Sequence, residues 1–171
     1  MIDRQLLEHL RQRGVRYCLI GASALAAHGW ARFTADVDLL TMDDVVLDPR
    51  FWSGFRTPEI RRGDADDPLA GLVRFAGDCD HDVIVGRGGA MAFAVHGAVP
   101  SPALGCPVAT PLALLLLKLE AGGPQDRSDI IGLVQAQRVL NGALWLAQVD
   151  QHLELLSTGA RRIWQELRPA L

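Results

Sequence analysis

Cysteine and lysine are both scarce in this sequence of 171 residues. The three cysteines, Cys18, Cys79 and Cys106, are odd in number and lack the close spacing of a metal-binding motif. They predict reduced thiols in a cytoplasmic protein rather than a disulfide framework. Lys118 is the only lysine among the 17 basic residues, which marks it as a candidate for a specific role.

Long apolar runs and a strong net charge are also missing. The longest apolar run, residues 111–117, is far shorter than the roughly 20 helical residues that span a bilayer, so no membrane partner is expected. Residues 1–10 predict an amphipathic helix rather than a signal peptide. A formal net charge of -3 argues against general nucleic-acid binding through a basic surface, and leaves only local arginine pairs at 61–62 and 161–162.

Apolar residues, in contrast, are plentiful enough for a core. At 49% hydrophobic content and this length, we expect one domain over residues 1–171. Mixed strand and helix patterns occupy residues 1–109, and helical patterns occupy residues 110–171. The order predicts an α+β fold, with a mixed sheet flanked by helices and a helical C-terminal third packed on it.

The central feature is the stretch from Tyr17 to Leu40. It predicts a strand at 17–20, a sharp turn at Gly21, a short helix at 22–27 and a second strand at 35–40. Ser23 lies in the first turn of that helix, where free backbone N–H groups and a hydroxyl can bind phosphate. Capping of the helix is the alternative role for Ser23.

Two aspartates mark the second of these strands. Asp36 and Asp38 project from one face of it, where their carboxylates repel each other unless a cation lies between them. Oxygen ligands of this kind suit Mg²⁺. A solvated strand edge is the alternative interpretation. Asp82, on a later strand at 79–85, is a candidate third carboxylate, and Asp80 has the same side-chain parity.

Other segments have weaker signals. The turn at 76–78 predicts a hairpin of strands 69–75 and 79–85, and Thr110 is a predicted cap for a helix at 112–120. We expect a short strand at 55–60, a polar loop at 61–68 and an edge strand at 106–109. His28 is expected to be packed or hydrogen-bonded, and the glycines at 86–89 to form a plain turn rather than a phosphate loop.

The motifs together resemble a known family. The order Gly21-Ala22-Ser23, Arg32, Thr34, Asp36 and Asp38 is similar to the signature of the DNA polymerase β-like nucleotidyltransferase superfamily, in its minimal, abortive-infection (AbiEii-like) branch. Ala22 stands where the family has a second glycine, unless Ser23 is that partner. Residues 114–129 resemble the family's Leu-Lys … Lys-Asp-x-x-Asp segment, and the whole resemblance covers about residues 15–135.

The resemblance implies a nucleotidyltransferase-type fold and a Mg²⁺- or Mn²⁺-dependent enzyme. Such an enzyme transfers a nucleoside monophosphate from an NTP such as ATP to a hydroxyl and releases pyrophosphate. The implied catalytic and metal-binding residues are Asp36, Asp38 and Asp82. The implied nucleotide-binding residues are Gly21, Ala22, Ser23, Arg32, Thr34 and Lys118. Asp126 and Asp129 are supporting candidates, or else acids that favour a helix N-terminus.

The branch resemblance implies a macromolecular acceptor, either tRNA or a protein hydroxyl, in a toxin–antitoxin or phage-defence setting with an antitoxin partner. A small-molecule acceptor such as an antibiotic is also compatible with the superfamily. The alternative class is a catalytically silent protein of the same fold that binds a nucleotide or a partner. The Ala22 replacement and the altered segment from Lys118 to Asp129 motivate this second hypothesis.

Overall fold

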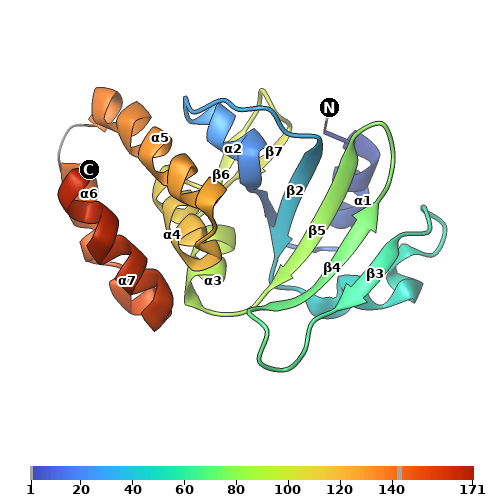
Figure 1. Cartoon of the computed structure of the whole chain (residues 1–171). Helices are drawn as coiled ribbons and strands as arrows, with labels where there is room; N and C mark the ends of the chain where they lie inside the picture. The colour runs from blue at the N-terminus through green and yellow to red at the C-terminus, as the bar shows by residue number, and fades with distance from the viewer. Residues whose placement is uncertain (1, 142–143) are drawn as a thin grey trace.

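The computed structural model describes residues 2–141 and 144–171, and its centre is one mixed sheet with helices around it (Figure 1). The sheet has seven strands in the order β3-β4-β5-β2-β1-β7-β6. The strands are β1 (Tyr17–Leu19), β2 (Asp36–Thr41), β3 (Glu59–Arg62), β4 (Leu69–Phe75), β5 (Asp80–Gly86), β6 (Val99–Ser101) and β7 (Cys106–Val108). The α-helices are α1 (Arg4–Gln12), α2 (Gly21–Ala27), α3 (Gly89–His96), α4 (Pro111–Ala121), α5 (Pro124–Asn141), α6 (Leu144–Asp150) and α7 (Thr158–Leu167). This architecture confirms the predicted α+β class.

The middle of the sheet combines parallel and antiparallel pairing. β2 runs antiparallel to β1 and parallel to β5, and β5 runs antiparallel to β4. β4 and β5 form the predicted hairpin across the turn at 76–78. Since β2 and β5 are parallel, their first residues meet at the same edge, with Asp38 directly beside Asp82.

One face of the sheet carries an aromatic core. Phe75 on β4 projects to this face, where its ring lies 4.9 Å from the ring of Trp52. Trp52 comes from the short 3₁₀ helix at Pro49–Trp52 and stacks on His9 of α1 at 5.3 Å. Neighbouring residues on a strand point to opposite faces, so Arg74 and its cross-strand partner Asp82 lie on the other face.

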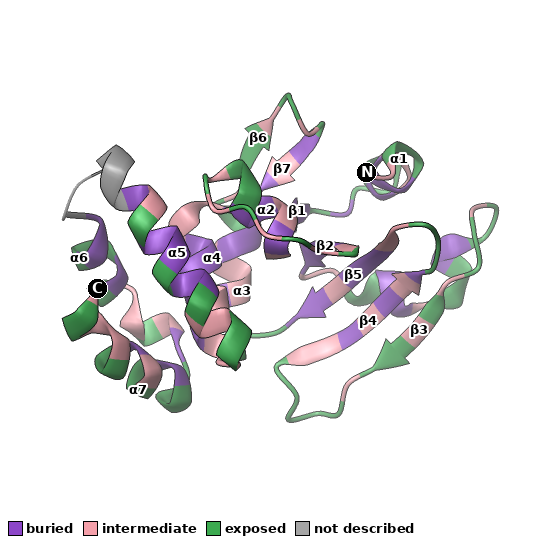
Figure 2. Ribbon diagram, turned by 45° about the horizontal axis from the view of Figure 1, so that its top comes forward, coloured by how far each residue is buried: buried purple, intermediate pink, exposed green. Residues whose placement is uncertain are grey.

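The C-terminal helices pack around α4, on the left of the sheet in Figure 1. α4 contacts α2, α3, α5, α6 and α7, and it is buried on most of its circumference (Figure 2). An apolar surface on nearly all sides requires such enclosure. The helix begins as predicted, with the Thr110 hydroxyl accepting a hydrogen bond of 3.3 Å from the N–H of Ala113. Within the described parts of the chain, neither α4 nor another helix combines the length and hydrophobicity needed to cross a membrane.

Two predicted strands differ from the structure. The strand expected at 55–60 lies instead at Glu59–Arg62, so Arg61 and Arg62 are strand residues rather than loop residues. It begins just after Pro58, whose missing N–H cannot join a ladder. β7 is not an edge strand, because it pairs with β1 through Val108 and with β6 on its other side. The edge position belongs to β6.

The buried surface of α4 leads to a prediction about stability. We expect Leu115→Ala to lower the free energy of unfolding by about 2–5 kcal/mol, because Leu115 is fully buried and its removal leaves a cavity. Urea denaturation measures the change. The matched control, Ile131→Ala on the exposed side of α5, is expected to stay within about 0.5 kcal/mol of the unaltered protein. Equal losses in the two variants would contradict the described core.

Candidate active site

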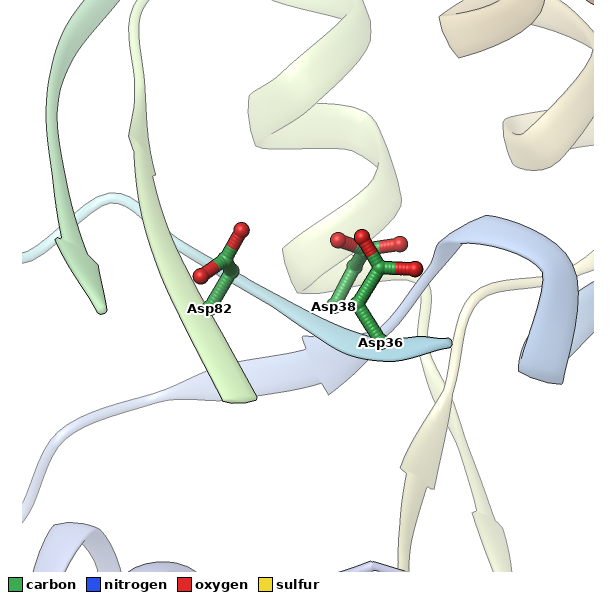
Figure 3. Close-up of side chains that lie close together, drawn as sticks. All are labelled: Asp36, Asp38 and Asp82. Atoms are coloured by element: carbon green, nitrogen blue, oxygen red, sulfur yellow. The ribbon is translucent and has the colours of Figure 1, made fainter. Parts of the chain in front are cut away.

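Three carboxylates meet where β2 and β5 begin (Figure 3). Asp36 and Asp38 project from β2 and Asp82 projects toward them from β5, and one oxygen of each lies within 4.8 Å of the others. The sequence left Asp80 and Asp82 as alternatives for the third position. The structure brings Asp82 to the cluster, whereas the Asp80 carboxylate accepts a hydrogen bond of 3.1 Å from the N–H of Gly77 and closes the hairpin turn.

The cluster is electrostatically unfavourable without a cation. Burial raises the pKa of Asp38 to about 6, and the negative charges of Asp36 and Asp82 add to the rise. Lys118 and Arg32 oppose it. Three carboxylates this close form the hard oxygen donor set that Mg²⁺ or Mn²⁺ prefers, so the residues present fit a divalent cation.

Gly21 is in direct contact with this cluster. Its φ of +65° lies in the left-handed region, and a Cβ atom added there would collide with the Oδ2 atom of Asp38. Only glycine can therefore adopt this left-handed conformation and also lie this close to the Asp38 carboxylate. Ala22 is buried beside it. Ser23 does not cap the helix, because α2 begins at Gly21 and its N-cap residue is Ile20.

Two cations, Lys118 and Arg32, share one buried partner. The Nζ atom of Lys118 is 2.7 Å from Oδ1 of Asp126 and 2.9 Å from Oδ2 of Asp129. Arg32 Nε lies 2.9 Å from Oδ1 of Asp129. Burial by itself raises the pKa of Asp129, but hydrogen bonds from Arg32 and Lys118 outweigh it and hold the pKa below its ordinary value. Asp129 is thus an ionised anchor for both cations.

Thr34 connects this region to the acids. Its hydroxyl donates a hydrogen bond of 2.6 Å to Oδ1 of Asp36. The structure therefore brings Asp36, Asp38, Asp82 and Gly21 together at one edge of the sheet. Arg32, Thr34 and Lys118 reach the acids through direct contacts or through their charges. Their roles in binding and catalysis stay predictions.

Arg74 is a member of the site that the sequence reasoning missed. Its guanidinium donates two hydrogen bonds to the Asp82 carboxylate, from Nε at 2.8 Å and from Nη2 at 2.5 Å. These bonds raise the pKa of Arg74 above its ordinary value. The signal was present in the sequence, because a hairpin centred on Asp78 places residue 74 opposite residue 82.

Trp30 was also missed, and it fixes the loop that leads into β2. Its indole ring packs so closely on Gly132 of α5 that a Cβ atom there would overlap the ring. The indole N–H also lies 3.4 Å from Oδ1 of Asp129. A glycine in the middle of a long helix was the available clue, since such a glycine often marks a close packing contact.

Two other motifs lie outside the acid cluster. His28 packs as expected, with Nε2 2.8 Å from the carbonyl oxygen of Ala109. The glycines at 86–89 end β5 and begin α3, at the opposite end of β5 from Asp82. They form the connection that the sequence favoured.

Comparison with known proteins adds evidence on the fold. No family model and no curated protein matches the sequence. The structure is similar to the solution structure of the antibiotic-resistance factor ANT(2″)-Ia, at a TM-score of 0.56 and 15% identity, over 97% of this chain and 94% of that one. It is also similar to the crystal structure of ANT(2″)-Ia in complex with adenylyl-2″-tobramycin, at a TM-score of 0.53 and 13% identity, over 86% of this chain and 94% of that one. The chain therefore has the nucleotidyltransferase fold.

The contact between Gly21 and Asp38 predicts a specific defect. We expect Gly21→Ala to weaken Mn²⁺ binding and to destabilise the protein by more than about 1 kcal/mol, because the new methyl group displaces the carboxylate and strains the turn. Calorimetry and urea denaturation measure the two effects. Gly14→Ala is the matched control, because Gly14 has a φ of +72° and open space around its Cβ position. Equal Mn²⁺ affinity in the two variants would argue against a cation at these acids.

The raised pKa of Asp38 predicts a dependence of stability on pH. Its pKa is about 6 in the folded protein, above the ordinary 3.8, so folding favours the protonated form, and stability falls as pH rises through 6. Without divalent ions, Asp38→Asn should raise the free energy of unfolding by about 1–2 kcal/mol at about pH 7.5. The gain should vanish near pH 4, where Asp38 is neutral. Urea denaturation at both pH values tests this, and an equal gain at both would refute the repulsion.

Proposed function

We propose that this protein is a divalent-metal-dependent nucleotidyltransferase, which transfers a nucleoside monophosphate from an NTP to a hydroxyl and releases pyrophosphate. The observation that carries the proposal is the cluster of Asp36, Asp38 and Asp82, with oxygens within 4.8 Å of one another, at one edge of a nucleotidyltransferase fold. Arg32 and Lys118 lie near enough for their positive charges to oppose the rise in the pKa of Asp38. Acids that attract a metal and cations that attract phosphates thus occupy one site.

Asp36, Asp38 and Asp82 would hold Mg²⁺ or Mn²⁺. When bound, such an ion supplies positive charge that stabilises the phosphate oxygens during displacement. Thr34 fixes the orientation of Asp36 through its hydrogen bond of 2.6 Å. Gly21 leaves room for the backbone to approach the acids, and Gly21, Ala22 and Ser23 form the turn proposed to receive the phosphates.

Arg32 and Lys118 neutralise charge on the triphosphate, and Asp129 keeps both in position. The Asp82 carboxylate takes the proton of the acceptor hydroxyl while the hydroxyl oxygen bonds to the α-phosphorus and the bond to pyrophosphate breaks. Arg74 engages one lone pair on each Asp82 oxygen, which leaves the second lone pair of each available. Arg74 therefore orients the Asp82 carboxylate and leaves a lone pair on each of its oxygens available for a metal ion or a proton.

Two classes of acceptor have support from different observations. The AbiEii-like motifs support tRNA or a protein hydroxyl, within a cytoplasmic toxin–antitoxin or phage-defence system that includes an antitoxin partner. The likeness to ANT(2″)-Ia, seen in complex with adenylyl-2″-tobramycin, supports a small antibiotic. We propose the macromolecular acceptor on the motifs, and include tobramycin as the competing substrate in the assay.

A specific observation favours the silent alternative as the second candidate. The cations that would receive a nucleotide are already in internal ion pairs, Lys118 with Asp126 and Asp129, and Arg32 with Asp129. In a silent protein these ion pairs would stay intact, because no phosphate competes for the cations. In an enzyme, the buried Asp129 remains the anchor while Lys118 shares its charge with the phosphates.

Transfer of label tests the proposal. The purified protein is incubated with each α-labelled NTP, Mg²⁺ or Mn²⁺, and tRNA, lysate protein or tobramycin. We expect label on one acceptor class, and we expect Asp36→Asn or Asp38→Asn to reduce the rate more than about 100-fold, because each removes a proposed metal ligand. Asp64→Asn in the exposed loop at 63–68 is the matched control for loss of one carboxylate. Near-normal turnover in Asp36→Asn or Asp38→Asn would overturn the assignment. No label together with no Mn²⁺ binding would favour the silent alternative.

A further inference from the structure

Phe33 is the most exposed large apolar side chain in the described residues. Its exposed fraction is 90%, against 50% for Val45, the next most exposed. Single apolar residues on a surface are ordinary, so exposure alone assigns no role. The position of Phe33 distinguishes it, because it lies three residues before Asp36, in the loop between α2 and β2.

The loop around Phe33 is anchored on both sides. Before it, Arg32 pairs with the fully buried Asp129, and Trp30 packs on Gly132. After it, the Thr34 hydroxyl donates to Asp36. The carbonyl oxygen of Phe33 itself accepts a hydrogen bond of 3.2 Å from Arg32. The backbone is thus held to the site by its neighbours, while the ring is left in solvent.

We propose that Phe33 is the stacking platform for the base of the bound NTP, an inference that rests on the proposed nucleotide binding. A nucleotide is anionic at one end and flat and aromatic at the other. Arg32 and Phe33 present the matching pair, a cation and an open ring, on consecutive residues. Three residues of chain span at most about 10 Å, so the backbone of Phe33 lies within about 10 Å of that of Asp36. A base whose phosphates are at Asp36 and Asp38 can reach across such a distance.

Stacking has consequences for specificity. Every base has a π face, so all four NTPs bind, and the larger purine ring covers more of the Phe33 ring than a pyrimidine does. Ring contact alone contributes no hydrogen-bond recognition. Phe33 therefore gives a preference for purine over pyrimidine rather than selection of a single base.

Equilibrium binding of non-transferable nucleotides tests the proposal. Calorimetry with α,β-methylene NTPs and Mg²⁺ compares the unaltered protein with Phe33→Ala, Phe33→Tyr and the exposed control Val45→Ala. We expect Phe33→Ala to raise the Kd for purine nucleotides about five- to fiftyfold, with a smaller rise for pyrimidines. Phe33→Tyr and Val45→Ala should bind as the unaltered protein does. Inorganic tripolyphosphate, which has no base, should bind equally to all four proteins.

The other outcomes separate this inference from the proposed function. If the unaltered protein binds the NTPs and Phe33→Ala binds them equally well, the stacking role is wrong and the proposed function stands. If Phe33→Ala weakens tripolyphosphate binding as much as it weakens nucleotide binding, the ring supports the loop instead of stacking on the base. A raised KM for the acceptor at unchanged NTP affinity would place the acceptor on Phe33. If the unaltered protein binds no NTP, both proposals fail.

Discussion

Repulsion among three carboxylates is the constraint on which the rest of the site depends. Asp36, Asp38 and Asp82 are brought within 4.8 Å by parallel pairing of two strands, and the raised pKa of Asp38 records the unfavourable charge. The surrounding residues respond to it. Arg74 pairs with Asp82, and Thr34 donates a hydrogen bond to Asp36. A folded protein that keeps such a cluster gives up stability at neutral pH, which is characteristic of a site kept for function.

Asp129 is the counterpart of the acid cluster. Its carboxylate is fully buried in α5, where an unpaired charge would be costly, and it is matched by Arg32, Lys118 and the indole N–H of Trp30. One anion thus holds two cations beside the three acids. The helical C-terminal part therefore contributes directly to the site, through α4 and α5, and is more than a cover for the sheet.

Local signals predicted local structure well. The hairpin of β4 and β5 and the cap at Thr110 each depend on residues within a few positions of one another, and the structure contains both. Strand position within the sheet depends on distant partners. β7 was expected at an edge, yet it pairs with β1, which lies more than 80 residues earlier in the chain.

The sequence by itself determined the same-face acids of β2, the turn at Gly21 and the fold class, because each follows from periodicity or from the conformational freedom of one residue. The tertiary structure decided the rest. It selected Asp82 over Asp80, because the hairpin turn uses the Asp80 carboxylate. It also placed Arg74 on Asp82 and both Arg32 and Lys118 on Asp129. The ion pairs to Asp129 join distant parts of the chain, and the side-chain contact of Arg74 becomes definite only once the strand register is set.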